Sequence, residues 1–111
     1  MKKTQFTLEY KTKTIEKLIG DPDIMINHFM FGNGEGLPVH NANSNVYMII
    51  LKGKLSLRLG TLDEVHQNGE ILTIPYGVEM HVRNEHDEPL EMFVLKAPHP
   101  DQYLKQNAEV I

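Results

Sequence analysis

The residues of this sequence best suited to metal chemistry are its histidines, six among 111 residues, and there is no cysteine. Imidazole nitrogens bind divalent iron, manganese, nickel and zinc, while the lack of cysteine excludes thiolate ligands, disulfides and a cysteine nucleophile. His28, His40 and His81 fall within or beside runs of β-forming residues. The remaining histidines lie beside turns, where we expect exposed side chains: His66, His86 and His99.

Other catalytic groups find little support in the residue spacing. Ser44 and Ser56 lack the flanking glycines of a nucleophile elbow. The adjacent carboxylates at 63–64 and 87–88 fall in charged turns, which favours solvated charge over a tuned acid and base. A phosphate loop needs a helix directly after its glycines, whereas the glycine-rich segment 32–36 is followed by extended chain. Nucleophilic hydrolysis and phosphate binding are therefore not the chemistry we expect.

Strands are the elements that must position the histidines. Short β-rich runs separated by glycine and proline fill the chain from about 23 to 97, which is typical of an antiparallel barrel or sandwich. Asn68-Gly69 is a strong hairpin signal and predicts a turn that joins 65–66 to 71–74. Segment 12–19 fits a strand or a helix, and 101–108 fits one short helix after Pro100. We expect strands over 24–31, 46–51, 54–59, 65–66, 71–74, 78–83 and 90–95.

Side-chain alternation assigns faces to two of these strands. Val78, Met80 and Val82 share one parity and should face the core, so His81 should face outward. Segment 46–51 is apolar at every position, which indicates a central strand with both faces covered. Because its second face needs another sheet or a second subunit, the segment also predicts a homodimer.

Two glycine-anchored spacings resemble the motifs of a known family, the single-domain cupins. Residues 34–53 carry Gly34, His40 and Gly53 at the spacings of the first cupin motif, and residues 69–84 match the second with Gly69, Pro75, Gly77 and Asn84. The resemblance covers about 34–84. It implies an all-β fold, a small antiparallel cupin β-barrel of the double-stranded β-helix or jelly-roll type, with a C-terminal helix at most. Residues 1–111 would form one domain with its barrel core at about 23–97.

Three of the four metal positions that the resemblance implies are altered. Only His40 remains, because Ala42, Val46 and Met80 stand where the family has two histidines and a glutamate. Alanine and valine donate nothing and a thioether is a weak ligand, so we predict no metal cofactor. The alternative is a metal-dependent enzyme, a dioxygenase or isomerase with iron, manganese, nickel or zinc, whose displaced site would use His40 with His81 or His28. His81 comes one residue late for the motif and therefore requires a strand bulge.

We predict instead that the barrel binds a small organic ligand, without evidence for turnover. Its walls would be apolar with His40 as the polar group, a composition typical of small-molecule sites. The polar stretch 40–45 either surrounds the entrance with amides that grip a carboxylate or sugar, or is a solvated loop. The predicted ligand-binding residues are His40, Asn45, Val46, Met48, Met80 and Val82.

Charge and hydropathy argue against some classes of binding partner. The net charge of −4, from 11 basic and 15 acidic residues, argues against nucleic acid. The N-terminus has no apolar stretch of signal-peptide length and no run could span a bilayer, so we expect a cytoplasmic protein without membrane contact. Three hypotheses follow: a metal-free ligand-binding barrel, a metal-dependent enzyme, and an interaction module whose product is its own dimer interface.

Overall fold

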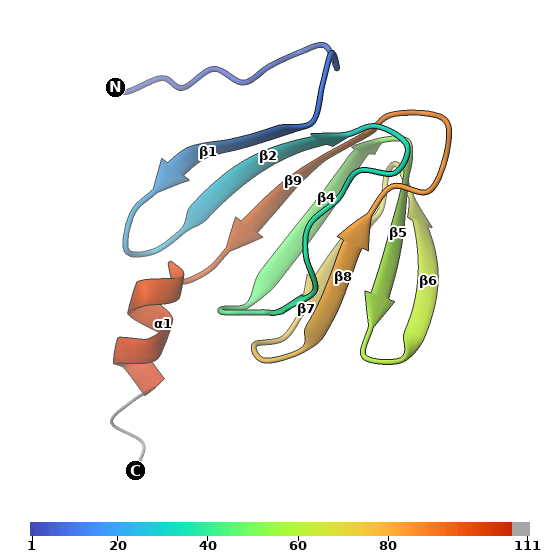
Figure 1. Ribbon diagram of the computed structural model, residues 1–111. Helices are drawn as coiled ribbons and strands as arrows, with labels where there is room; N and C mark the ends of the chain where they lie inside the picture. Colours follow the sequence, from blue (N-terminus) through green and yellow to red (C-terminus); the bar gives the residue numbers. More distant parts are fainter. Residues whose placement is uncertain (108–111) are drawn as a thin grey trace.

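The structure, a computed structural model, describes residues 1–107 of the chain. Nine strands and one short helix make up the described part (Figure 1). In chain order they are β1 (Thr14–Gly20), β2 (Met25–Phe31), β3 (His40–Asn41), β4 (Val46–Lys52), β5 (Lys54–Leu59), β6 (Leu62–Gln67), β7 (Ile71–Ile74), β8 (Glu79–Arg83), β9 (Leu90–Lys96) and α1 (Pro100–Asn107). No helix in this part is long and apolar enough to cross a membrane.

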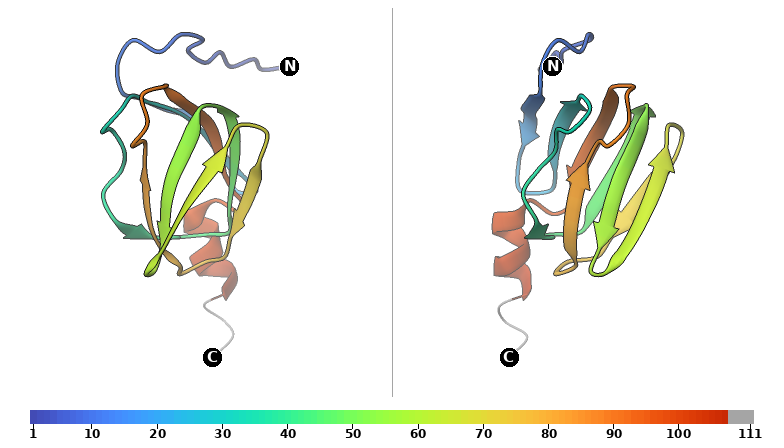
Figure 2. Two further views of the ribbon diagram at one scale, coloured as in Figure 1. Left: turned by 90° about the vertical axis from the view of Figure 1, so that its right-hand side faces the viewer. Right: turned by 45° about the vertical axis from the view of Figure 1, so that its right-hand side comes forward.

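The strands form two antiparallel sheets that face each other. Sheet A has the order β1-β2-β9-β4-β7, and sheet B the order β3-β8-β5-β6. Figure 2 shows the two layers curving around a shared interior, with α1 beyond one end of the barrel and the N-terminal segment beyond the other. The predicted all-β antiparallel barrel with a short C-terminal helix is confirmed; of the predicted helix 101–108, residue 108 lies outside the described residues.

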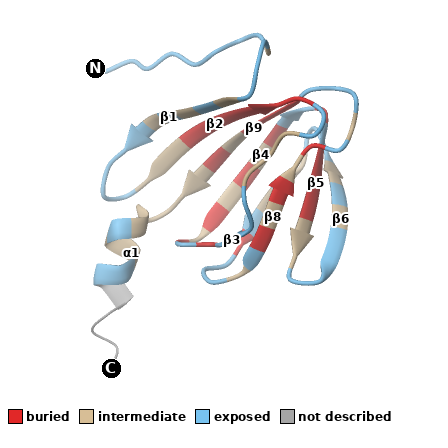
Figure 3. Ribbon diagram, viewed as in Figure 1, coloured by how far each residue is buried: buried red, intermediate tan, exposed pale blue. Residues whose placement is uncertain are grey.

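The core fills the space between the sheets with the inward-facing parity of each strand. On β8 the burial pattern alternates, so that Met80 and Val82 are buried while His81 is not, and Val78 packs against the same core from just before the strand. The predicted inward set and the outward His81 are therefore confirmed. Figure 3 shows the buried residues concentrated on β2, β9, β4, β8 and β5. The core comprises Phe29, Phe31, Ala42, Val46, Met48, Ile50, Leu55, Leu57, Ile74, Met80, Val82, Leu90, Met92 and Val94.

The hairpin prediction at Asn68-Gly69 was wrong about strand pairing. The turn itself forms, with φ +92° at Gly69, but β6 pairs with β5 in sheet B whereas β7 pairs with β4 in sheet A. The chain therefore crosses from one sheet to the other at this turn. The turn residues determine the local bend, but they do not determine which strand β7 pairs with. Leu72 and Ile74 find their apolar neighbours beside Met48 and Val46 instead.

The segment that fitted either strand or helix is a strand. Thr14–Gly20 pairs with β2 at the edge of sheet A, with a bulge between Lys17 and Ile19. Residues 1–13, the N-terminal arm, run before it; the ring of Phe6 lies 5.0 Å from the rings of both His28 and Phe93.

One motif glycine is required by close packing. Gly53 has φ +76°, and a Cβ there would collide with the carbonyl oxygen of Pro89. A side chain at this position is disfavoured both by the backbone conformation and by the lack of space. The motif glycine therefore lets the β4–β5 turn approach the segment before β9.

Candidate ligand site at the barrel mouth

One end of the barrel, the barrel mouth, collects the positions that the cupin resemblance singles out. Here β4 and β8 begin and β9 ends, close to α1 (Figure 1). Residues directly opposite each other in antiparallel strands face the same side of the sheet, so the register defines two inner rows on sheet A. The first row contains Ile74, Val46, Lys96 and Met25, and the second Leu72, Met48, Val94, Asn27 and Lys17.

Four of the predicted ligand-binding residues come together, but as packed core. Val46, Met48 and Met80 each expose 2% of their surface and Val82 exposes 1%. They belong to one continuous apolar cluster. Surface hollows occur elsewhere in the described chain, and their walls do not include these side chains. The four residues therefore form a filled apolar floor beneath the mouth.

The other two predicted residues lie at the rim. His40 pairs with Met80 across β3 and β8, is exposed, and has its Nδ1 2.8 Å from the carbonyl oxygen of Pro38. Asn45 donates from Nδ2 to the carbonyl oxygen of Ala97 at 3.4 Å. Asn45 therefore ties its loop to the chain after β9, whereas His40 keeps its Nε2 available at the rim.

Sequence reasoning missed two polar residues on the inner face. Lys96 is directly opposite Val46 and Met25, is only partly exposed, and forms no ion pair or hydrogen bond within the described residues. Burial lowers the pKa of its ammonium group, and the nearby charge of Lys17 lowers it further. Asn27 exposes 6% of its surface, and its Oδ1 has no hydrogen-bond partner.

A signal for both residues exists in the sequence. On β9, Met92, Val94 and Lys96 share the buried parity, so a lysine ends an otherwise apolar row. On β2, Asn27 shares its parity with the buried Phe29. A polar residue on the apolar parity of a strand is the pattern that would have identified each.

The three candidate metal-binding histidines do not converge. His40 lies at the mouth, His81 faces outward from sheet B opposite Arg58, and His28 faces outward from sheet A. Within residues 1–107, no three histidine, aspartate or glutamate side chains cluster in a way that could hold a metal ion. The displaced metal site therefore has no geometric support.

His28 has a different role from ligation. It is fully buried, and its two ring nitrogens lie 2.8 Å from the carboxylates of Glu16 on β1 and Glu91 on β9. A neutral imidazole has one N–H and can donate to only one carboxylate, so hydrogen bonds at both nitrogens require either a doubly protonated ring that donates to both or a protonated glutamate that donates to the ring. Both nitrogens are therefore occupied by protein groups.

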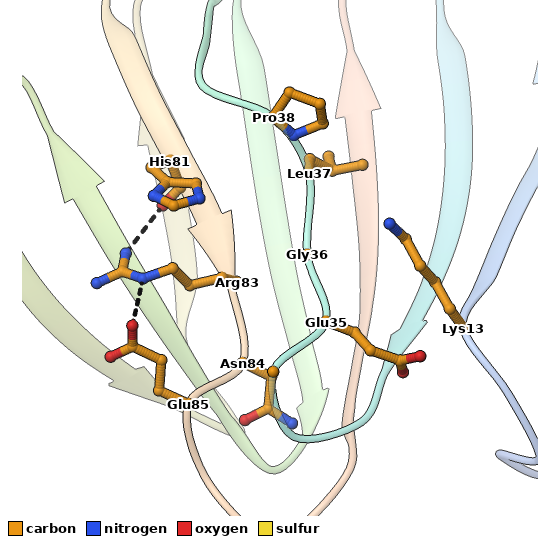
Figure 4. A pocket seen from close by; sticks show the side chains of 10 residues that line it. Lys13, Glu35, Gly36, Leu37, Pro38, His81, Arg83, Asn84 and Glu85 are labelled. Atoms are coloured by element: carbon orange, nitrogen blue, oxygen red, sulfur yellow. Dashed lines mark hydrogen bonds and ion pairs between the residues drawn. The ribbon is translucent and has the colours of Figure 1, made fainter.

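A second candidate site is a surface hollow of about 520 Å³ on the outer side of β8 (Figure 4). Three of its charged side chains, Glu35, Arg83 and Glu85, already have partners. Arg83 donates from Nε to Glu85 at 2.8 Å and from Nη2 to Asp63 at 3.2 Å, and Glu35 accepts the hydroxyl of Tyr10 at 2.6 Å. A ligand that bound to these groups would have to displace the existing contacts, which costs binding free energy.

Comparison with known proteins places this geometry in a family. No protein-family model matches the chain. An uncharacterized protein of Methanocaldococcus jannaschii is 39% identical over 97 residues, which cover 86% of this chain and 84% of the relative. The crystal structure of an RmlC-like cupin family protein with a double-stranded β-helix fold from the same organism superposes with a TM-score of 0.89 at 38% identity, covering 92% and 94% of the two chains. This chain belongs to the RmlC-like cupin family.

A more distant cupin shows how widely the fold is retained. An RmlC-like cupin protein from Desulfovibrio desulfuricans has a TM-score of 0.73 at 23% identity, over 89% of this chain and 98% of its own. In the present cupin, the four positions of the family's metal motif hold His40, Ala42, Val46 and Met80, of which all but His40 are buried apolar side chains. A single imidazole donor does not fit a divalent metal, which needs several donors in fixed directions.

Proposed function

We propose that this cupin binds a small organic carboxylate at the barrel mouth, without a metal centre. The observation that carries the proposal is Lys96, a partly buried ammonium group on the inner face with no anionic partner in the described chain. A buried charge is costly unless it is paired. A ligand carboxylate would supply the missing pair.

The neighbours of Lys96 specify the rest of the ligand. Asn27 Oδ1 lies in the next inner row and lacks a donor, so a hydroxyl or N–H group on the ligand would satisfy it. Lys17 adds a second positive charge in the row of Asn27. The predicted ligand class is therefore a small hydroxy- or amino-substituted carboxylic acid.

Calorimetry can test the proposal with a panel of small hydroxy and amino acids and the amide of each. Carboxylates should bind, and the amides, which lack the carboxylate charge, should bind at least about tenfold more weakly, because a charge-assisted hydrogen bond contributes about 1.5–3 kcal/mol. Lys96→Gln should reduce affinity by about 10- to 100-fold. Lys54→Gln, which removes an exposed lysine of sheet B, is the matched control and should leave affinity unchanged.

Two results would contradict the proposal. One is the absence of binding to the wild type across the panel at millimolar concentration; the other is equal affinity of wild type and Lys96→Gln for every acid that binds. A ligand that binds the two lysine variants alike would have to occupy another surface, such as the hollow beside Arg83.

A further inference from the structure

Lys96 lies in an apolar part of the inner face of sheet A. Its neighbours across the strands are Val46 on β4 and Met25 on β2, and Val94 precedes it on the same face of β9. Val46 and Val94 expose only 2% and 3% of their surface. The amine of Lys96 is therefore partly removed from water without gaining a polar neighbour in its own row.

The backbone that carries Lys96 is held on both sides. Lys96 pairs with β2 and with β4, and the chain directly after it is bound to the loop before β4. Ala97 donates its N–H to the carbonyl oxygen of Asn45 at 3.1 Å, and its own carbonyl oxygen accepts the Asn45 amide at 3.4 Å. The hydroxyl of Ser44 donates to the carbonyl oxygen of Pro98 at 2.6 Å. The lysine side chain therefore starts from a defined point at the mouth, as a positioned reactive group must.

The surroundings of Lys96 favour its neutral amine, which is the nucleophilic form of lysine. Burial lowers the pKa of the ammonium group, and the charge of Lys17 lowers it further. A neighbouring carboxylate would raise this pKa, but Lys96 forms no ion pair within residues 1–107, and Glu91 on the same strand contacts His28 on the outer face. A lysine that is desolvated beside a second cation is activated for attack on a carbonyl carbon.

We propose that Lys96 forms a reversible Schiff base with the carbonyl group of a small 2-oxo carboxylic acid at the barrel mouth. This inference deepens the proposed function and rests on it for the place of binding, because the carboxylate of the ligand brings the adjacent carbonyl group to this lysine. It adds a covalent step that carboxylate pairing alone does not include.

The reaction balances without an oxidant or a reductant. The amine lone pair attacks C2 of the oxo acid, a C–N bond forms, and the carbonyl π electrons move to oxygen, which takes a proton from the nitrogen. Asn27 Oδ1, in the next inner row and without a partner, is available to accept a hydrogen bond from the new hydroxyl. The hydroxyl then leaves as water. One ammonium and one ketone thus give one iminium and one water, and the nitrogen stays positively charged beside the ligand carboxylate.

Reductive trapping with pyruvate and sodium cyanoborohydride at neutral pH tests this capture. Hydride addition to the imine carbon gives a stable secondary amine, so the chain gains the mass of pyruvic acid less one oxygen atom. We expect one adduct per chain, and peptide mass mapping should place it on Lys96, because exposed lysines are almost fully protonated at this pH. Lys54→Gln, which removes an exposed lysine of sheet B, is the matched control and should give the same adduct.

Lys96→Arg separates covalent capture from carboxylate pairing. Arginine keeps the positive charge but stays protonated, so this variant should still bind lactate in calorimetry and should lose the pyruvate adduct. An adduct spread evenly over the exposed lysines would overturn the Schiff base. So would a wild type that binds lactate through Lys96 but is not trapped by pyruvate, a result that leaves the proposed function intact. An adduct on Lys96 without lactate binding would support capture and contradict the proposed function. Mapping uses the wild type, so the test stays decisive if Lys96→Arg does not fold.

Discussion

Replacing His28 with leucine tests whether the buried imidazole holds β1, β2 and β9 together. His28 is fully buried, and the side chain of Glu91 is only 9% exposed, so the substitution leaves a carboxylate unpaired inside the protein. Breaking a buried ion pair by removing one partner costs about 3–5 kcal/mol. The contact to Glu16, 28% exposed, adds less because water can replace it.

The expected loss can be measured by urea and thermal unfolding. For a domain of this size, 1 kcal/mol corresponds to about 4 °C, so His28→Leu should lower the melting temperature by about 12–20 °C. His66 is the matched control, because it also lies between two glutamates, at 2.7 and 2.8 Å, but is 22% exposed with partners that are 37% and 41% exposed. His66→Leu should cost about 1 kcal/mol or less.

A double variant separates the stranded charge from the lost packing. His28→Leu combined with Glu91→Leu removes the unpaired carboxylate, so it should recover a large part of the stability. Equal costs for His28→Leu and His66→Leu would refute the reasoning, because burial would then not matter. A double variant less stable than His28→Leu alone would show that packing, rather than charge, dominates the site.

Four further expectations concern the pH dependence of stability, the backbone at Gly53 and the metal content. The pKa of Glu16 is lowered by hydrogen bonds from the arm's backbone and from the buried imidazole, so its contribution to stability is lost as pH falls through the folded-state pKa, and Glu16→Gln should flatten the acid limb of a pH-stability curve. Burial opposes protonation of His66, but its two glutamates outweigh burial and raise its pKa, so that contribution is lost as pH rises through the folded-state pKa, and His66→Gln should flatten that limb. Gly53→Ala should destabilise the fold by about 1–3 kcal/mol in urea titrations. If the Gly53→Ala variant were as stable as the wild type, that result would contradict the expected collision with Pro89. Elemental analysis of protein purified without added metal should find far less than one equivalent, and stoichiometric iron, manganese, nickel or zinc that His40→Ala abolishes would contradict the poor fit of the donor set.

Periodicity made the strands and their faces predictable, because burial selects alternate residues along each strand. This alternation was enough to predict that Met80 and Val82 face inward and that His81 faces outward. The strand pairing on either side of Gly69 could not be predicted from the sequence, since local turn chemistry contains no information on which sheet the next strand joins. Long-range apolar contacts decide that choice.

The site was predicted in its apolar part more fully than in its polar part. Val46, Met48 and Met80 do gather beneath the mouth, since they occupy inward positions on β4 and β8, which belong to the two facing sheets. Whether such side chains enclose a cavity or fill one depends on packing volumes that spacing does not contain. Lys96 and Asn27 were visible as breaks in apolar parity, but their lack of partners appears only once all strands are placed.

The register of Lys96 gives a reason why the missing metal donors and the proposed ligand belong together. Lys96 stands directly opposite Val46. Val46 occupies the position where the family motif has its glutamate ligand. A divalent cation about 6 Å from an ammonium group would be repelled by roughly 5 kcal/mol at an effective dielectric constant of about 20. An anion at the same place would be attracted by the ammonium charge that repels a metal cation. Loss of the glutamate and two histidines and the presence of an unpaired lysine therefore favour the same outcome, a mouth suited to a carboxylate.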